Sequence, residues 1–425
     1  MRILHVTQLY WPFTGGSERY LSAIAERQVL AGHEVTVLTT DAFDLELFWS
    51  RWARRIDVDH DTHNGVRIVR LPVRHLPVSE FAFPAVRYLT WGLSQLPAVP
   101  IAALRALGTT TPYVPALRRA LRGRAFDADL IHGINICFEG VLEPAQDLAR
   151  RSGVPFVLTP LTHLAERAGD AVSRYYTMRH QIELSRTADA VFAMTGIERD
   201  YLASRGVDAG RIHVAGVGVD PDAVTGGSPR RFVDTFGVEP PFVFYVGTAA
   251  FDKGTVHVVE AMRRLWARGE VTPLVIAGPT LRAFRDYVDH LPVADHERVH
   301  LLGVISEADK RDLFAAGTVF AMPSRTDSFG IVFLEAWLND VPVIGARAGG
   351  VPAVIEHGND GYLVRFGDVE DLAGRIAELL ADRNLRWRFG HSGHAKTMTR
   401  YTWDAIYPTI EAVCSALPAG LPARA

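Results

Sequence analysis

Asp327 and Glu335 are the residues of this chain whose type and spacing point most directly to a chemistry. They stand eight positions apart, on either side of Ser328-Phe329-Gly330-Ile331, where a helix is expected to begin. The free backbone N–H groups at such a helix start can face an anion. Because a helix rises about 1.5 Å per residue, the two carboxylates are at most roughly 12 Å apart along its axis. This spacing fits a ligand with hydroxyls at both ends and phosphates between them, as in a sugar nucleotide.

The alternative for this pair is purely structural. Asp327 would cap the helix, and Glu335 would face water. Glu335, however, lies within the apolar run from Ile331 to Trp337. An unpaired carboxylate is costly in such surroundings. The sequence therefore favours a functional partner for Glu335.

Lys253 is a second candidate, because it stands in the segment Val246–Gly254 after an expected strand. The chain has only three lysines, Lys253, Lys310 and Lys396, so lysine is an unusual choice here. A lysine at this place can reach an anionic ligand as a mobile point charge. The alternative is a solvated loop lysine paired with Asp252, but we favour the functional role.

A glycine pair, Gly15-Gly16, lies between the first expected strand and the first expected helix. Glycines there let the backbone approach a phosphate closely, with a helix N-terminus behind it. The alternative is an ordinary turn in which Ser17 caps the helix. The segment is not a GxGxxG fingerprint, which argues against a nicotinamide or flavin enzyme.

Strands and helices alternate in two halves of the chain, which predicts two doubly wound α/β domains. A loop rich in glycine, serine and proline at Gly226–Pro229 marks the linker. We expect an N-terminal Rossmann-like acceptor-binding domain over residues 1–222 and a nucleotide-sugar-binding domain over 223–405. Residues 406–425 are expected to form a helix and tail that cross back to the first domain. In such folds a ligand occupies the cleft between domains. The expected strands cover residues 3–7, 34–39, 65–71, 130–132, 155–159, 190–195 and 212–216, then 242–246, 274–277, 299–302, 319–321 and 342–345. The last two helices are expected over residues 369–389 and 403–417.

Composition narrows the possible partners and compartments. The net charge of −3 over 425 residues gives no reason to expect nucleic acid. The only two cysteines, Cys137 and Cys414, fit a reducing compartment. No secretory signal opens the chain, and prolines and Arg105 interrupt the apolar stretch from Leu89 to Leu107. We therefore expect a soluble, cytoplasmic protein.

Three further stretches carry charge without a clear chemistry. The acidic and histidine-rich Asp57–His63 is expected to be a polar loop rather than a metal site. An aromatic–basic run and a second, arginine-rich run leave open a peripheral contact with anionic lipid at the inner face of the membrane. We favour a half-buried helix with a solvated face for each. The two runs comprise Phe48, Trp49, Arg51, Trp52, Arg54 and Arg55, and Arg118, Arg119, Arg122 and Arg124.

The segment DSFGIVFLEA, followed by PVIGARAGGVPAVIEHGNDGYLV, resembles family 4 of the retaining glycosyltransferases, which have the GT-B fold. The segments GGSE, AGHEVTVLTT, DADLIH, ADAVFAMT and DKG occur in that family's order. The likeness covers nearly the whole chain and is weakest between Asp41 and Asp127. The defining pattern of the family is two glutamates separated by seven residues, and the spacing of Asp327 and Glu335 matches it.

The resemblance implies a role for each candidate residue. Glu335 would hold the ribose hydroxyls of the donor nucleotide, and Asp327 would sit beside the transferred sugar. Lys253 would bind the diphosphate and stabilise the leaving group without a metal. Gly15-Gly16 would approach the phosphate from the opposite domain. Backbone groups of Ser328, Phe329, Gly330 and Ile331 would meet the sugar and the diphosphate.

Three residues depart from the family pattern. Asp327 replaces a glutamate, which shortens its reach by one methylene. Thr248 stands among the donor-binding positions where many members carry an arginine. Ile134 occupies the place of a second histidine after the acidic strand. His132 is then either a catalytic candidate or a satisfied core histidine. Asn135 and His163 are the other candidates on the acceptor side.

The resemblance implies a retaining, metal-independent glycosyltransferase with no cofactor. It would move a sugar from a nucleoside-diphosphate sugar to a hydroxyl of a glycan, a lipid-linked or a small-molecule acceptor. The alternative is a catalytically weak or inactive sugar-nucleotide-binding module of the same fold. Neither the donor base nor the sugar follows from the sequence, although the backbone around Gly303–Ile305 is a candidate for base recognition.

Overall fold

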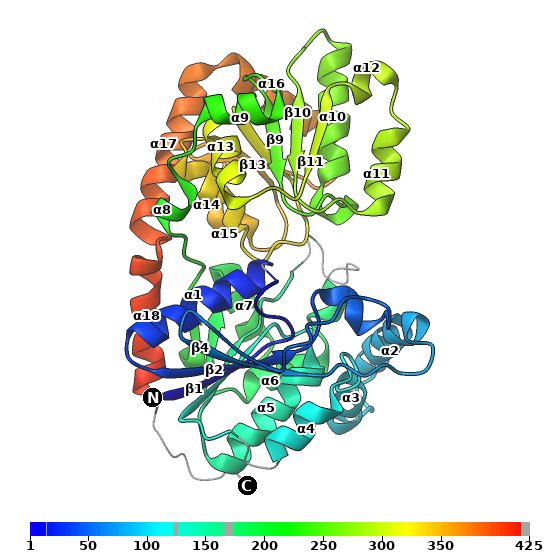
Figure 1. The fold of residues 1–425 in the computed structure, drawn as a ribbon, viewed down its shortest axis with the longest axis vertical. Coiled ribbons are helices and arrows are strands. Elements are labelled where there is room, and N and C mark those ends of the chain that lie inside the picture. The colour runs from blue at the N-terminus through cyan, green and yellow to red at the C-terminus, as the bar shows by residue number, and fades with distance from the viewer. Residues whose placement is uncertain (14, 123–125, 165, 167–172, 418–425) are drawn as a thin grey trace. The chain divides into compact units, whose positions relative to one another are not determined.

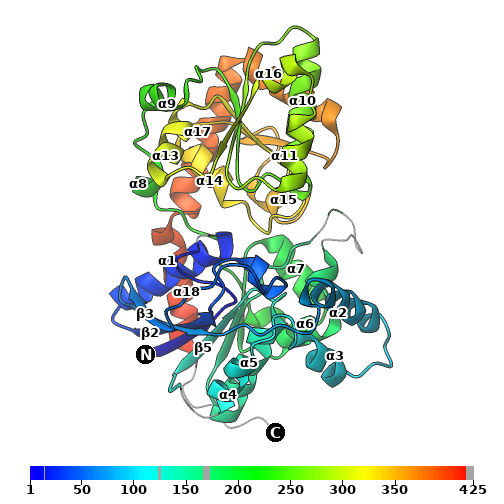
Figure 2. The same cartoon turned by 45° about the vertical axis from the view of Figure 1, so that its right-hand side comes forward.

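The computed structural model describes residues 1–13, 15–122, 126–164, 166 and 173–417. These residues form two compact units, each a parallel sheet between layers of helices (Figures 1 and 2). The first unit contains Met1–Thr162, Ser173–Gly216 and the chain from Tyr407 onward. The second contains Val217–Ile406 together with His163, Leu164 and Glu166.

Within the described residues, the first unit has an eight-stranded sheet in the order β3-β4-β2-β1-β5-β6-β7-β8. All neighbouring strands are parallel except the edge strand β3, which runs antiparallel to β4. The strands are β1 (Arg2–Val6), β2 (Glu34–Thr40), β3 (His60–His63), β4 (Val66–Leu71), β5 (Leu130–Ile134), β6 (Phe156–Thr159), β7 (Ala190–Ala193) and β8 (Ile212–Val214).

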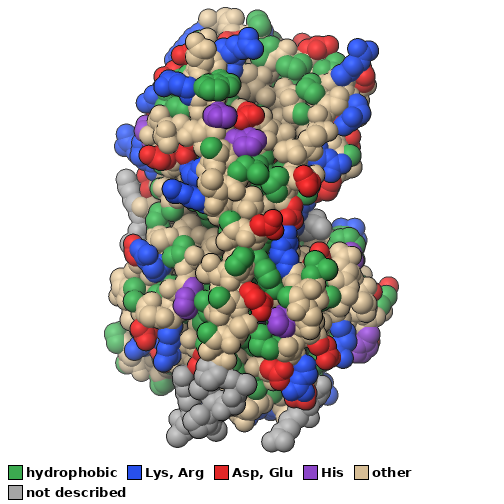
Figure 3. Space-filling view, turned by 90° about the vertical axis from the view of Figure 1, so that its left-hand side faces the viewer, with side chains coloured by type: hydrophobic (Ala, Val, Ile, Leu, Met, Phe, Trp, Pro, Cys, Tyr) green, Lys and Arg blue, Asp and Glu red, His purple; other side chains and the backbone are tan. Residues whose placement is uncertain are grey.

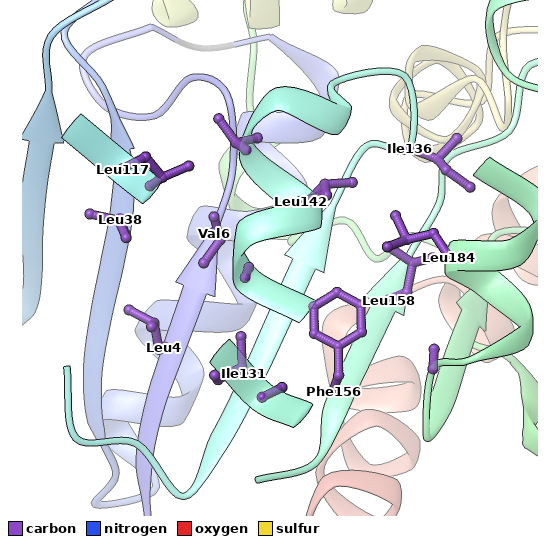
Figure 4. Close-up of a cluster of buried hydrophobic side chains, with 14 of the residues drawn as sticks. Leu4, Val6, Leu38, Leu117, Ile131, Ile136, Leu142, Phe156, Leu158 and Leu184 are labelled. Atoms are coloured by element: carbon purple, nitrogen blue, oxygen red, sulfur yellow. The ribbon is translucent and has the colours of Figure 1, made fainter. Parts of the chain in front are cut away.

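Helices cover both faces of this sheet. Right-handed crossovers that leave β1 and β5 in opposite directions place α1 on one face and α5 on the other. The α5 face holds the main hydrophobic cluster, in which Leu142 of α5 packs towards Leu4, Ile131 and Leu158 of three neighbouring strands (Figure 4). The helices are α1 (Gly16–Leu30), α2 (Ser79–Ser94), α3 (Ile101–Gly108), α4 (Pro115–Arg122), α5 (Glu139–Ser152), α6 (Arg179–Arg186), α7 (Gly196–Ser204) and α18 (Trp403–Ala416).

The second unit has a parallel sheet in the order β11-β10-β9-β12-β13-β14 over the described residues. Its strands are β9 (Val243–Val246), β10 (Leu274–Ala277), β11 (Val299–Gly303), β12 (Val319–Met322), β13 (Val343–Ala346) and β14 (Gly361–Val364). Helix α10 packs with α16, α13 with α9, and α14 with α17 (Figure 1). The helices are α8 (Pro221–Val224), α9 (Pro229–Phe236), α10 (Thr255–Ala267), α11 (Arg282–Asp289), α12 (Val293–His296), α13 (Glu307–Ala316), α14 (Ile331–Leu338), α15 (Val351–Val354), α16 (Val369–Ala381) and α17 (Arg383–Arg400).

Each sheet contains a point where the strand order reverses direction. In the first unit this point lies between β1 and β5, and in the second it lies between β9 and β12. Loops that leave the carboxyl ends of two such strands diverge to opposite faces and open a crevice, where doubly wound folds bind ligands. The loops after β1, β5, β9 and β12 are therefore the places to look for a site.

The twelve strands assigned from the sequence correspond to strands of the sheets, but β3 and β14 were not predicted and one helix boundary was wrong. A single helix was expected from Val369 to Phe389, whereas α16 ends at Ala381 and α17 begins at Arg383. Asp382 makes the break, because its side chain accepts hydrogen bonds from the backbone N–H groups of Asn384 at 2.8 Å and Leu385 at 2.9 Å. Such a cap stabilises a new helix start.

Candidate active site

Lys253 and Asp327 follow the two strands that flank the reversal point of the second unit. Lys253 ends the short turn after β9, and Asp327 lies in the loop after β12. The Lys253 Nζ donates to Asp327 Oδ1 at 3.0 Å. Burial raises the pKa of Asp327, but the positive charge of Lys253 and the hydrogen bond from the Ser324 hydroxyl lower it by more. The pKa of Asp327 therefore lies below its usual value. The sequence candidates from two distant segments thus form one ion pair.

Glycines hold these two loops against their neighbours. Gly254 has φ +76°, and a Cβ there would come within 2.3 Å of the Pro323 carbonyl oxygen. Gly349 has φ +59°, and its Cβ would come within 2.2 Å of the Asp327 carbonyl oxygen. The backbone N–H of Gly350 donates to that same oxygen at 2.9 Å. Only glycine permits such close approaches in a left-handed conformation, so these residues fix the position of Asp327.

The N-terminus of α14 lies three residues after Asp327 and has no side-chain cap. Its N-cap, Gly330, has φ +90°, and Ile331 is the first helical residue. Ser328 precedes the turn, and the buried Phe329 ring packs edge-on against Tyr401 at 5.4 Å between centroids. The backbone N–H groups at this helix start thus meet no capping side chain and can bind an anion.

Glu335 is buried in α14, with an exposed fraction of 3%. Its Oε1 accepts a hydrogen bond from Lys310 Nζ of α13 at 2.9 Å, and Lys310 also lies 3.1 Å from Glu307. Sequence reasoning foresaw a partner for Glu335 but did not name Lys310. The scarcity of lysine was the signal, since Lys396 also pairs with a buried acid, Asp360. All three lysines of the chain are therefore ion-paired with an acid of the second unit.

His163 clusters with the second unit. Burial lowers the pKa of His163 to about 4; the charge of Lys253 lowers it further, and that of Asp327 opposes the shift. The imidazole is therefore neutral at neutral pH, in the electrostatic reach of the Lys253–Asp327 pair.

Thr248 lies in the loop after β9, where the Tyr245 hydroxyl donates to its carbonyl oxygen at 2.9 Å. An arginine that the sequence did not single out, Arg325, stands two positions before Asp327. Its Nε donates to Asp252 Oδ1 at 2.8 Å, and its guanidinium lies 4.8 Å from the centroid of the Phe366 ring. Asp252 thus pairs with Arg325 rather than with Lys253, so the structural alternative for Lys253 was wrong.

The loop after β1 in the first unit brings Gly15 and Gly16 to the start of α1. Gly15 is the N-cap and makes no side-chain hydrogen bond. A Cβ on Gly15 would come within 2.4 Å of Glu18 Oε2, whereas one on Gly16 would meet nothing within 4 Å. Ser17 lies inside the helix, so the alternative in which it caps the helix was wrong. Because nothing lies within 4 Å of that Cβ position, a ligand can reach the backbone at Gly16.

The loop after β5 begins with Asn135, which has φ +73°. Left-handed backbone in a residue other than glycine is uncommon and is often retained at functional sites. Asn135 Oδ1 is buried and accepts no hydrogen bond from any part of the chain that the structure describes. Ile134, one residue earlier, is fully buried in β5. Of these two positions, Asn135 alone presents unused hydrogen-bonding capacity.

Two family models match most of the chain. Residues 15–218 match the glycosyl transferase 4-like domain, and residues 230–396 match glycosyl transferases group 1. The chain belongs to the group 1 glycosyltransferases. The two doubly wound units constitute the GT-B fold of these enzymes.

Several curated glycosyltransferases resemble parts of the chain. The α-maltose-1-phosphate synthase of Mycobacterium tuberculosis is 30% identical over 246 residues, which cover 52% of this chain and 61% of that protein. The α-D-kanosaminyltransferase of Streptomyces kanamyceticus is 29% identical, covering 57% and 64%. The sulfoquinovosyl transferase of Arabidopsis thaliana is 27% identical, covering 66% and 55%. In each case the match spans less than two thirds of the relative's length.

Solved structures share the fold over nearly the full length. The Anabaena protein HepE, crystallised with UDP and glucose, superposes with a TM-score of 0.71 at 20% identity, covering 98% of this chain and 100% of that one. The sucrose-phosphate synthase of Thermosynechococcus elongatus gives a TM-score of 0.71 at 19% identity, covering 97% and 98%.

His132 lies in the middle of β5 in this glycosyltransferase, not at the strand's end. Its Nδ1 is 3.1 Å from His5 Nδ1, its Nε2 is 2.8 Å from Thr159 Oγ1, and His5 Nε2 is 2.7 Å from Gln28. Burial lowers the pKa of His132 well below its usual value. The structure supports the interpretation as a satisfied core histidine, and we assign His132 no catalytic role.

The charged stretches of the first unit resolve into ordinary structure. The segment Asp57–His63 was expected to be a loop, but its second half forms β3. Within this strand, Asp61 pairs with Arg70 at 3.1 Å and the His63 ring stacks on Trp11. No group of three or more metal-ligating side chains is found among the residues described. On the face drawn in Figure 3, acidic and basic side chains are interspersed.

The two expected amphipathic helices have different outcomes. Helix α4 is half-buried, with Leu117 and Leu121 inside and Arg119 and Arg122 outside, as expected; Arg124 lies outside the described residues. The aromatic–basic run is not a helix, because the 3-10 turn ends at Phe48. None of the helices in the described chain has the length and apolarity needed to span a membrane.

Proposed function

We propose that this glycosyltransferase moves a sugar from a nucleoside-diphosphate sugar to an acceptor hydroxyl, with retention of anomeric configuration and without a metal ion. The observation that carries the proposal is the Lys253–Asp327 ion pair at the reversal point of the second sheet, beside the uncapped start of α14. HepE of Anabaena, which shares the fold, has been crystallised with UDP-glucose, which supports a nucleotide-sugar donor.

The donor diphosphate is assigned to the positive end of this site. The backbone N–H groups of Gly330 and Ile331 and the Lys253 ammonium supply hydrogen bonds and positive charge together. A lysine and a helix N-terminus can stabilise the charge that develops on a leaving diphosphate. This arrangement supports a mechanism in which protein groups, rather than a metal, carry that charge.

The donor ribose is assigned to Glu335. A carboxylate has two oxygens with about four acceptor sites. The hydrogen bond from Lys310 uses Oε1 and orients the side chain. In this assignment Glu335 accepts hydrogen bonds from the two ribose hydroxyls, while Lys310 acts as a positioning residue.

The reaction exchanges one glycosidic bond for another. The bond between the sugar's anomeric carbon and the β-phosphate oxygen breaks, and the acceptor oxygen bonds to that carbon on the same face. The acceptor's proton passes to the leaving phosphate oxygen, so a nucleoside diphosphate departs. Asp327 accepts hydrogen bonds from sugar hydroxyls and orients the ring, and Lys253 stabilises the departing phosphate.

The experiment is a donor panel. The protein is incubated with UDP-, GDP- and ADP-sugars, with and without acceptors and with a chelator, and nucleoside diphosphate release is followed. NMR of the product reports the configuration at the anomeric carbon. We expect release from one donor class, unaffected by the chelator, and a retained configuration. An inverted product or a chelator-sensitive rate would contradict the mechanism.

A second candidate is a sugar-nucleotide-binding module with weak or no catalysis. Thr248, in place of an arginine common in the family, favours it, since one cationic contact to the diphosphate is then lacking. The nearby Arg325 contacts Asp252 and the Phe366 ring, so it does not replace that missing arginine. Tight donor binding without any nucleotide release, across varied acceptors, would establish this alternative.

A further inference from the structure

A pocket of about 460 Å³ lies in the first unit and has no part in the site described above. Pockets of this size enclose much of a small organic ligand. Five aromatic side chains form most of its wall, with Leu45 and Pro84 completing the apolar lining. The aromatic residues are Trp49, Phe83, Phe138, Tyr175 and Tyr176.

The pocket lies at the carboxyl edge of the sheet, beside its reversal point. Trp49 follows β2, Phe83 belongs to the helix after β4, Phe138 follows β5, and Tyr175 follows β6. These strands lie on both sides of β1 in the order β4-β2-β1-β5-β6. In doubly wound folds this edge is where ligands bind. The pocket wall thus includes the loop after β5, one of the two strands at the reversal point, and no described residue of the loop after β1.

Among the described residues of the pocket wall, Arg87 is the one cation, and its charge is already neutralised. Arg87, which is 6% exposed, pairs with the fully buried Glu139 and donates to the Tyr175 carbonyl oxygen at 3.0 Å. Glu139 also accepts from Gln181 at 2.7 Å and lies 3.1 Å from His180 Nε2. Buried against Glu139 and the Tyr175 carbonyl, Arg87 adds no net positive charge to the pocket wall. A phosphate or carboxylate group is therefore a poor ligand for this pocket.

The remaining polar groups of the wall carry no positive charge. Burial raises the pKa of the Cys137 thiol to about 12, so this side chain is neutral. Burial also raises the pKa of the Tyr176 hydroxyl. Glu80 is exposed and adds a negative charge at the rim. The lining as a whole offers flat apolar surfaces and repels anions.

We propose that this pocket binds a neutral, planar aromatic portion of the acceptor, such as an aglycone of two or three rings, and rests its ring against Trp49 and Phe83. The proposal builds on the proposed function, since it names the acceptor class of the same enzyme. Aromatic walls bind a flat ring by stacking and edge contacts with little loss of side-chain freedom. An anionic, lipid-linked acceptor does not match the closed Arg87–Glu139 pair or the exposed Glu80.

The test uses the full chain and a probe whose binding needs no donor. Binding of 2-naphthyl β-glucoside is measured by calorimetry and by tryptophan fluorescence, against farnesyl phosphate as the anionic, lipid-like probe. Trp49→Ala removes a pocket wall. Trp52→Ala is the matched control, because Trp52 is 85% exposed and lies outside the pocket. Thermal unfolding of both variants verifies that they are folded.

We expect the naphthyl probe to bind, Trp49→Ala to weaken it at least tenfold, and Trp52→Ala to stay within twofold of wild type. Equal affinities of the two variants, or tighter binding of farnesyl phosphate that Trp49→Ala abolishes, would overturn the aromatic assignment. UDP-, GDP- and ADP-glucose binding to wild-type protein is measured in parallel. Absent donor binding would count against the proposed function, whereas absent naphthyl binding with intact donor binding would count only against the pocket proposal.

Discussion

The two units of this glycosyltransferase hold their buried acids in different ways. In the second unit, acids near the site are held by lysines, and the pKa of Asp327 is lowered as a result. In the first unit, Glu18 and Glu198 are held by neutral groups, whereas Glu139 pairs with Arg87. Gln8 donates to Glu18 at 2.9 Å, and the Met194 backbone N–H donates to Glu198 at 2.7 Å. Burial there raises the pKa of Glu18 to about 7 and also raises that of Glu198.

This difference matches what each site would bind. A diphosphate needs positive charge, which the Lys253 ammonium and the N-terminus of α14 would supply together. A neutral acceptor needs surfaces without net positive charge, which the aromatic pocket and its closed Arg87–Glu139 pair supply. The two units share one type of fold, but the second unit has charged side chains at its site and the first unit has a largely apolar pocket. Substitutions on either edge can break the contrast.

The largest expected effect is that of Lys253→Ala. The variant should lose 100- to 1000-fold in turnover, because one lost charge contact to a leaving group costs roughly 3–4 kcal/mol. Steady-state release of nucleoside diphosphate measures it. Arg365→Ala is the control, because Arg365 is an exposed cation of the same unit. Activity of Lys253→Ala within threefold of wild type would remove Lys253 from the mechanism.

The sequence predicted the fold for a physical reason, but it did not predict that Lys253 pairs with Asp327. Buried parallel strands are short apolar runs, and the carboxyl ends of adjacent strands bring distant loops together. It could not predict Lys310 as the partner of Glu335, because α13 and α14 meet only through tertiary packing. Nor could it place Cys137 and Tyr175 in one pocket, since their loops follow different strands and share no local pattern.

His132 shows the limit from the other side. A histidine near the end of an expected strand could point to a site or into the core, and strand alternation alone does not decide between them. The structure extends β5 to Ile134 and pairs His132 with His5 beneath α1. Because the strand continues for two residues beyond its expected end, His132 lies within the sheet and is a core residue rather than a catalytic candidate.

Lys310→Met tests whether the second unit depends on its lysines for both stability and binding. Removing one partner of a buried ion pair destabilises a protein by roughly 3–5 kcal/mol. We expect a loss of that order in urea unfolding and at least tenfold weaker donor binding by calorimetry.

The double variant Lys310→Met/Glu335→Leu separates the two effects. With both charges replaced by apolar groups, stability should return to near the wild-type value, because buried pairs often contribute little net stability. Donor binding should stay weak, because no ribose acceptor remains. Recovery of donor binding in the double variant would exclude Glu335 as the ribose contact.

Glu18→Gln tests the neutral edge of the first unit through pH. The pKa of about 7 in the folded state lies above the ordinary 4.5, so at pH 8 the folded state carries a buried charge that it sheds as pH falls through 7. A glutamine keeps the contact to Gln8 without that charge. We expect the variant to be roughly 2–3 kcal/mol more stable than wild type at pH 8 and much closer to it at pH 5. Urea unfolding at both values measures this, with Glu26→Gln of the same helix as control.

Asp327→Asn is the smallest and most selective change. Asp327 Oδ1 accepts a hydrogen bond from Lys253 Nζ at 3.0 Å, so a diphosphate must compete with this carboxylate for the ammonium. Removing the negative charge should tighten binding of the bare nucleoside diphosphate by about fivefold, or roughly 1 kcal/mol, while sugar transfer falls. Asp252→Asn is the matched control, because Asp252 adjoins Lys253 in sequence but pairs with Arg325. If both variants bound the nucleoside diphosphate equally, the Lys253–Asp327 pair would be structural, and the electrostatic contrast between the two edges would no longer bear on donor binding.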